Sequence, residues 1–86
     1  MRLDKFLKVS RLIKRRTVAK DICAGEKVSV NGRLAKPSAE IRPGDLIMID
    51  MKRHILEVKV LQVLPSVKAE EAPTLYEVLR DENKGE

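Results

Sequence analysis

The chain has 86 residues and a formal net charge of +5, and aromatic residues make up only 2% of it. A chain of this length forms one small domain, which buries only about 60% of the surface that its unfolded form exposes. Its single cysteine, Cys23, excludes a disulfide within the monomer, and no stretch approaches the ~20 apolar residues of a membrane span. We therefore expect a soluble, unprocessed monomer of the cytoplasm.

Positive charge is concentrated in the first twenty residues. They carry eight Lys and Arg residues against one acid, Asp4, whereas the other sixty-six residues carry ten bases and twelve acids. Clustered bases release counterions from phosphates when they bind them, so this segment is a candidate polyanion-binding face. A basic run is also often only a solvated surface. Because aromatic rings for base stacking are nearly absent, we expect contacts to the nucleic-acid backbone and shape.

Two helices are predicted at the N-terminus. Apolar residues in the segment 3–13 recur every three or four positions, which is typical of a helix. The bases there step by three, and a straight helix would spread them around its surface, so we place a break near Ser10. Residues 14–16 are predicted to link to a second short helix. Its N-cap is Thr17, and Gly25 is the left-handed residue at its end.

The remainder of the first sixty-four residues predicts a small curved antiparallel sheet of four to five strands. Asn31-Gly32 is a strong signal for a tight hairpin turn, and residues 42–45 form a second turn with proline and glycine. Apolar residues follow at 46–50, and an alternating run at 55–64 supplies a longer strand. The expected fold class is therefore α+β, with the two helices packed on the sheet.

The C-terminal part is predicted to be helical. Residues 65–73 resemble a linker, and residues 74–80 place their apolar side chains on one helical face. We expect this helix to pack back on the sheet or to dock on a protein partner, and the last residues to be frayed. The predicted division is a domain over 1–64 and a linker with helix and tail over 65–86.

An ordered set of motifs spans about the first fifty residues. The set consists of Arg2 to Leu7, Arg11, Lys14 to Ala19, Gly25, Val28, Val30 to Gly32, Lys36 to Ser38, Ile41, Gly44 and Asp45. In order and spacing it resembles the RNA-binding domain named after small-subunit ribosomal protein S-four, also called the αL motif. The resemblance implies two helices on a small curved β-sheet, and RNA as the ligand.

In its length and in the segment Ala72 to Leu79, the chain is most similar to the RqcP family of bacterial ribosome-quality-control factors. That family is related to the fifteen-kilodalton heat-shock protein. This resemblance implies binding to a large ribosomal subunit obstructed by peptidyl-tRNA, with contacts to ribosomal RNA and tRNA. It also implies support for a partner protein that adds alanine tails to the stalled nascent chain. We expect no cofactor, no metal and no membrane among its ligands.

The resemblance also implies which residues face RNA. They are Arg2, Lys5, Arg11, Lys14, Arg15, Arg16, Thr17 and Lys36. Guanidinium groups bind phosphate oxygens bidentately, and a helix start offers N–H groups and a positive dipole end to the same anion. We therefore expect Arg15, Arg16 and Thr17 to converge on one phosphate. Asp4 is expected to orient a neighbouring arginine or to cap the first helix.

Several other residues have plainer interpretations. Apolar residues assigned to the core are Phe6, Leu7, Leu12 and Ile13. Cys23 is interpreted as a small buried hydrophobe without a metal-ligand cluster around it. Asn31 is first a turn residue, and a direct RNA contact is the lesser alternative. His54 is expected to be exposed and without a catalytic role.

Two alternative functions follow from the same sequence. The basic module also begins many RNA-modifying enzymes, such as pseudouridine synthases, but residues 51–86 contain no recognisable nucleophile, base or cofactor loop. The second alternative is a protein–protein adaptor whose charge only aids solubility. Binding to structured RNA at varied salt separates the adaptor from an RNA-binding factor.

Overall fold

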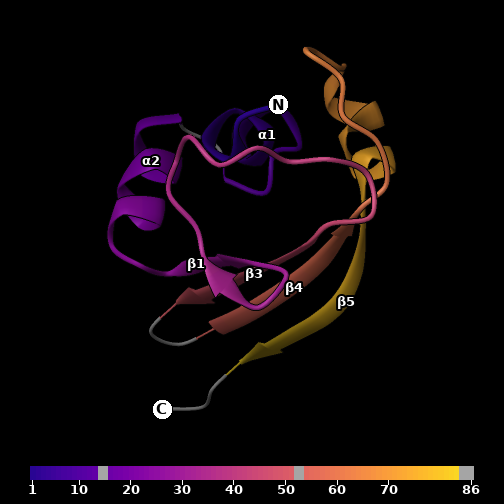
Figure 1. The fold of residues 1–86 in the computed structure, drawn as a ribbon. Helices are drawn as coiled ribbons and strands as arrows, with labels where there is room; N and C mark the ends of the chain where they lie inside the picture. Colours follow the sequence, from indigo (N-terminus) through magenta and orange to yellow (C-terminus); the bar gives the residue numbers. More distant parts are fainter. Residues whose placement is uncertain (14–15, 52–53, 84–86) are drawn as a thin grey trace.

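The computed structural model describes residues 1–13, 16–51 and 54–83, with the backbone alone at residues 16 and 17. Helices lie on one side of a five-stranded antiparallel sheet whose strand order is β2-β1-β3-β4-β5 (Figure 1). The elements in chain order are α1 (Leu3–Val9), α2 (Arg16–Ala24), β1 (Val28–Val30), β2 (Arg33–Leu34), β3 (Leu46–Met51), β4 (His54–Val60), the 3-10 helix η1 (Ala69–Leu75) and β5 (Tyr76–Asn83). The α+β class and the number of strands are confirmed. No described helix is long and apolar enough to cross a membrane.

Helix α1 is short because the chain turns sharply after Val9. Ser10 is its C-cap, and the Ser10 hydroxyl donates a hydrogen bond to the carbonyl of Leu7 at 3.2 Å. Arg11 follows in the left-handed region with φ 61°, a conformation that ends a helix. The predicted break near Ser10 is therefore confirmed, and Leu12 continues outside the helix.

Helix α2 ends in a Schellman motif. The Lys27 amide donates to the carbonyl of Ile22 at 3.2 Å, and the Glu26 amide donates to the carbonyl of Cys23 at 3.1 Å. Glu26 therefore holds the left-handed position, with φ 61°. The assignment of that position to Gly25 was wrong by one residue, because Gly25 is still the C-cap of the helix. The helix begins at Arg16, so Thr17 is its second residue. The predictions that Thr17 is the N-cap and that Arg16 belongs to the linker were therefore wrong.

The hairpin β1–β2 closes where Asn31-Gly32 predicts it. Asn31 has φ 53° and Gly32 has φ 83°, which is the pair of positive values that a type I′ turn needs. The Asn31 side chain donates to Asp45 Oδ1 at 3.1 Å and accepts from the Leu46 amide at 2.9 Å. Asn31 thus fastens the hairpin to the turn before β3, in agreement with a structural role.

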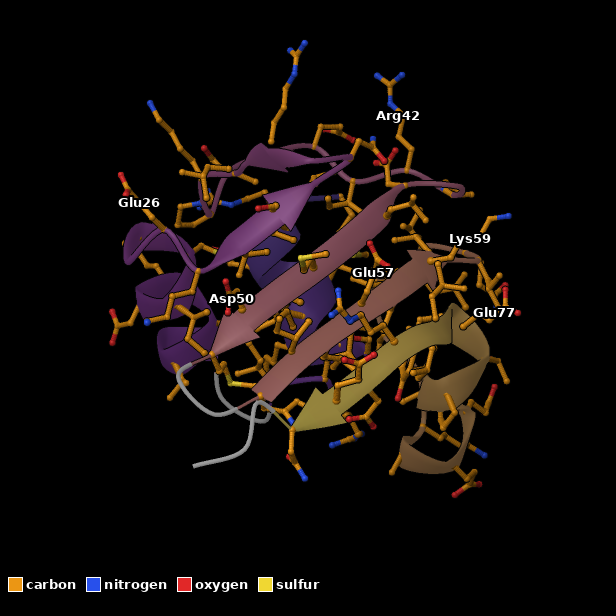
Figure 2. The ribbon with its side chains drawn as sticks, turned by 90° about the horizontal axis from the view of Figure 1, so that it is seen from below. Glu26, Arg42, Asp50, Glu57, Lys59 and Glu77 are labelled. Atoms are coloured by element: carbon orange, nitrogen blue, oxygen red, sulfur yellow. The ribbon has the colours of Figure 1, made fainter. Side chains whose placement is uncertain are left out.

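The core lies between the helices and the inner face of the sheet. Val28, Ile47, Ile49, Val58 and Val60 alternate along β1, β3 and β4 and are all almost fully buried. From the helical side the core receives Leu3, Phe6, Leu7, Ile13, Ala19 and Cys23. Leu12, predicted to be core, is only partly buried against this cluster. The outer face of the sheet is solvent-exposed and carries Asp50, Glu57, Lys59 and Glu77 (Figure 2).

The C-terminal segment is the main correction to the predicted fold. Residues 69–75 form a 3-10 helix that lies mostly in the predicted linker over 65–73. Most of the helix predicted over 74–80 is instead part of strand β5, which spans residues 76–83. Strand β5 pairs antiparallel with β4 from Val60↔Tyr76 to His54↔Asn83, with a register shift at Glu57/Val58. The pairing satisfies the open edge of β4, a demand that local apolar spacing does not reveal. The predicted division at residue 64 stays a prediction.

Candidate nucleic-acid interface

Arg2 is held in place by a buried carboxylate. Its Nε donates to Asp4 Oδ1 at 3.1 Å, and its Nη2 donates to Asp4 Oδ2 at 3.2 Å. The Asp4 side chain is 2% exposed, whereas the Arg2 side chain is 51% exposed. Asp4 therefore orients a neighbouring arginine, as expected, and keeps the guanidinium at the surface. The pair uses two donor atoms of Arg2, and the fork retains further N–H groups for a ligand.

The loop that carries Lys36 is bound to the start of α1. The Leu3 amide donates to the carbonyl of Ala39 at 2.8 Å, and the Asp4 amide donates to the carbonyl of Pro37 at 3.1 Å. Because these early helical N–H groups are already used, positive charge at this end comes from side chains and not from free amides. Lys36 is exposed directly before Pro37, and Lys5 is half-buried on the first turn of α1. The fold thus brings Arg2, Lys5 and Lys36 to one end of the helix.

Arg11 lies at the opposite end of α1. It is exposed, and it makes no ion pair with any carboxylate among the described residues. A helix of seven residues is ~10 Å long at 1.5 Å per residue, so the two ends are separated by about that distance. A single phosphate cannot contact both ends. We therefore treat them as separate contact points on the helical layer, by which we mean α1 and α2 together with the turn after α1.

Half of the predicted site falls where side chains are not described. Lys14 and Arg15 lie outside the described residues, and Arg16 and Thr17 are described only as the backbone that begins α2. Convergence of Arg15, Arg16 and Thr17 on one phosphate therefore stays a prediction. Lys8, a residue that the site prediction left out, is exposed in the last turn of α1 near Arg11. Its three-residue step from Lys5 and Arg11 was the signal that could have included it.

The acid next to this end of the chain is paired within the protein. Glu40 accepts a hydrogen bond from the amino group of Met1 at 2.8 Å, and Arg2 forms a β-bridge with Glu40 through the backbone. The hydrogen bond and the charge of that amino group lower the pKa of Glu40. The Met1 amino group therefore partly neutralises the negative charge of the Glu40 carboxylate next to the basic residues.

Cys23 is buried, and His54 contacts the neighbouring strand. Burial, with a smaller effect from Asp4, raises the pKa of the Cys23 thiol to about 11, so the thiolate nucleophile is not formed near neutral pH. His54 is half-buried, not exposed as predicted, because it pairs with Asp81 and contacts Asn83 of β5 at 2.9 Å. Those contacts join two strands. No metal-binding group of three His, Cys, Asp or Glu side chains occurs within the part of the chain that the structure describes.

A family comparison agrees with the fold and with this basic helical layer. The S4 domain model matches residues 1–47, which is more than half of the chain. Helices α1 and α2, the hairpin and the start of β3 all lie in the matched part. The chain belongs to the S4 domain family, as the motifs indicated.

Known proteins similar over the whole chain carry a more specific name. The protein named "RQC P-site tRNA stabilizing factor" of Bacillus subtilis (strain 168) is 45% identical over 86 residues, covering all of both chains. The protein of the same name from Halalkalibacterium halodurans is 49% identical over 82 residues, covering 95% of this chain and 93% of that protein. The solved structure of Heat Shock Protein 15 of Vibrio cholerae matches with a TM-score of 0.84 and 32% identity, covering 91% of this chain and 80% of that one.

Proposed function

We propose that this protein is a non-catalytic RNA-binding factor of ribosome-associated quality control. In this proposal it binds tRNA in the P site, together with ribosomal RNA, on a large subunit obstructed by peptidyl-tRNA in the cytoplasm. By stabilising that tRNA, it supports the partner protein that adds alanine tails to the stalled nascent chain. The names of full-length relatives support the assignment to quality control and to tRNA.

The observation that carries the proposal is the Arg2–Asp4 arrangement. A carboxylate that is 2% exposed fixes a guanidinium that is 51% exposed, at the end of α1 where Lys5 and Lys36 also lie. An arginine that served only solubility would not need a buried orienting partner. Preorganised guanidinium groups lose little entropy when they bind phosphate oxygens, so this geometry favours a phosphate ligand.

The surroundings of Cys23 and His54 support a binding role over a catalytic one. The buried thiol of Cys23 is in its protonated form at neutral pH, and His54 links β4 to β5. An adaptor function, the remaining alternative, predicts that RNA affinity is weak and nonspecific. We therefore distinguish the two functions by RNA affinity and by the ribosomal state that the protein selects.

The decisive experiment measures co-sedimentation with ribosomal particles. We expect the protein to sediment with large subunits that carry peptidyl-tRNA, and much less with empty large subunits or with intact ribosomes. Fluorescence anisotropy with isolated tRNA over a salt series provides the second readout. Affinity is expected to fall steeply with salt because each neutralised phosphate releases counterions. Equal sedimentation with all three particles would contradict the P-site proposal.

The Arg2→Gln variant tests the contribution of the oriented guanidinium. We expect its affinity for tRNA to fall by about tenfold, which corresponds to the loss of about 1.4 kcal/mol of binding free energy. The slope of log K against log salt is expected to become shallower by about 0.7 to 0.9, as for the loss of one phosphate contact. Thermal melting of the variant shows whether the fold is retained.

Arg80→Gln is the matched control. Arg80 is exposed on β5, where it pairs with Glu82 at 3.2 Å, and it lies on the sheet and not in the helical layer. We expect both the tRNA affinity and the salt slope of this variant to equal those of the unmodified protein. Equal weakening in Arg2→Gln and Arg80→Gln would show that net charge alone determines binding.

A further inference from the structure

A cavity lies at the far end of α1 from Arg2. Its volume is about 180 Å³, and it is lined by Lys8, Val9, Arg11, Pro65, Ser66 and Val67. The wall opposite α1 is thus formed by the segment between β4 and η1, which rises beside the helical layer in Figure 1. One buried water needs about 10 to 15 Å³, so the cavity has room for a tetrahedral oxyanion.

The polar groups of the cavity suit an anion. Lys8 and Arg11 bring two positive charges, Ser66 brings a hydroxyl, and no acidic residue is among the lining residues. Within the described ranges, no carboxylate pairs with Lys8 or Arg11, and the Ser66 hydroxyl makes no hydrogen bond. Two cations held close together repel each other, and a bound anion removes that repulsion. Val9, Pro65 and Val67 contribute the apolar part of the lining.

The cavity is held by contacts that do not depend on a ligand. Val63 and Val67 pack against the core, and the Leu61 amide donates to the carbonyl of Leu75 at 2.8 Å. These contacts fix both ends of the segment that carries Ser66. On the other wall, the Arg11 amide donates to the carbonyl of Lys8 at 3.0 Å, which holds the turn after α1. A site whose walls are already positioned binds at a lower entropic cost.

Arg11 has a backbone conformation that its residue type disfavours. Its φ of 61° is unfavourable for a residue other than glycine, and glycine or asparagine is usual at the end of a helix. Strained positions of this kind are often found at functional sites. A glycine at position 11 would relax the backbone but would remove one of the two charges of the cavity.

We infer that this cavity binds a backbone phosphate of RNA, with Lys8 and Arg11 neutralising its charge and the Ser66 hydroxyl donating a hydrogen bond. The inference rests on the proposed function, because it takes RNA as the ligand, and it adds Lys8 and Ser66 to the residues that contact RNA. The phosphate bound here is a different one from that at Arg2, since the helix separates the two points by ~10 Å.

Two variants test the cavity without changing the residues predicted to face RNA. Lys8→Gln removes one charge, and Ser66→Asp places a carboxylate where the phosphate is expected. The probes are tRNA and large subunits carrying peptidyl-tRNA, and the readouts are anisotropy over a salt series and co-sedimentation. We expect Lys8→Gln to weaken tRNA binding about fivefold and to make the salt slope shallower by about 0.7 to 0.9. Ser66→Asp is expected to weaken binding by at least about tenfold, because the added carboxylate repels the phosphate.

Lys59→Gln is the control, since Lys59 is exposed on the outer face of the sheet (Figure 2). We expect its salt slope to be unchanged. Amide NMR spectra recorded during titration with tRNA provide a local readout, and the amides of Arg11, Ser66 and Val67 are expected to shift in the unmodified protein and much less in Lys8→Gln. Melting curves and free-state spectra verify that each variant is folded.

The outcomes distinguish this inference from the proposed function. If Arg2→Gln weakens tRNA binding while Lys8→Gln and Ser66→Asp bind as the unmodified protein does, the cavity inference is overturned and the proposed function stands. If the unmodified protein binds neither tRNA nor obstructed large subunits, both are overturned. If tRNA affinity is unchanged in the cavity variants but co-sedimentation is lost, anisotropy with protein-free large-subunit ribosomal RNA decides the outcome. Weaker binding of that RNA by the variants assigns the phosphate to ribosomal RNA and supports the inference, whereas unchanged binding overturns an RNA phosphate as the ligand of the cavity.

Discussion

Left-handed backbone conformations fall on three non-glycine residues of the described chain, namely Arg11, Asn31 and Glu26. Asparagine tolerates this region better than most residues, and the Asn31 side chain also hydrogen-bonds to the distant residues Asp45 and Leu46. Arg11 lines the cavity beside α1. Glu26 is exposed at the end of α2, and its carboxylate makes no hydrogen bond or ion pair within the described ranges. Glu26 therefore has the strain of the conformation without a visible compensating contact.

Glu26→Gly is expected to stabilise the protein. Glycine removes the strain of the left-handed position, while its greater freedom in the unfolded chain offsets part of the gain. We expect the free energy of unfolding to rise by about 0.5 to 1 kcal/mol, measured by chemical denaturation with circular dichroism. Glu26→Ala is the control, because it removes the same charge but keeps a β-carbon. An equal gain in both variants would assign the effect to charge.

At the scale of elements, β5 decides how the C-terminal segment packs. Leu75 is fully buried at the end of η1, whereas Val78 and Leu79 on β5 are 49% and 48% exposed. As a helix, these three residues would have shared one buried face. Because the segment instead forms a 3-10 helix followed by an edge strand, only Leu75 reaches the core. The register shift at Glu57/Val58 accommodates Leu79, the residue of β5 that has no partner on β4.

Truncation of Leu75 and Leu79 tests this arrangement. Leu75→Ala is expected to lower the free energy of unfolding by about 2 to 5 kcal/mol, because it leaves a cavity in the core. Leu79→Ala is expected to cost less than about 1 kcal/mol, since nearly half of that side chain is already in water. Denaturant titrations of both variants supply the comparison. Similar losses for the two would favour the helical arrangement over the strand.

On the scale of the whole molecule, two faces of different charge enclose one core. The helical layer carries Arg2, Lys8 and Arg11, whereas the outer face of the sheet carries acids and bases mixed, among them Glu57 and Lys59 (Figure 2). Strand β5 completes the sheet by pairing along β4, and Leu75 belongs to the same core cluster as the helical side chains. We therefore expect the part after residue 64 to unfold together with the rest.

Cooperative unfolding is measurable with one natural probe. Tyr76 is the only tyrosine, no tryptophan is present, and Tyr76 pairs with Val60 at the start of β5. We expect the denaturation midpoint from tyrosine fluorescence to coincide with the midpoint from far-ultraviolet circular dichroism, as in two-state unfolding. An earlier fluorescence transition would mean that the C-terminal segment separates from the domain, as the predicted division at residue 64 implies.

Local signals in the sequence were sufficient for much of the fold and for locating the basic segment. The break near Ser10 and the Asn31-Gly32 turn depend on neighbouring residues, and both were predicted. The basic N-terminal segment was likewise visible as charge along the chain. A conformational preference of a few residues, or a surplus of one charge, needs no knowledge of distant partners.

The tertiary structure decided what depends on contacts between distant segments. It placed residues 76–83 as a strand because β4 offered an unpaired edge, and it brought Lys36 to the start of α1 through hydrogen bonds to Pro37 and Ala39. It also formed the cavity between Lys8 and Ser66. The physical reason is that pairing of backbone groups and burial of apolar surface are settled by the whole chain, and they override weak local propensities.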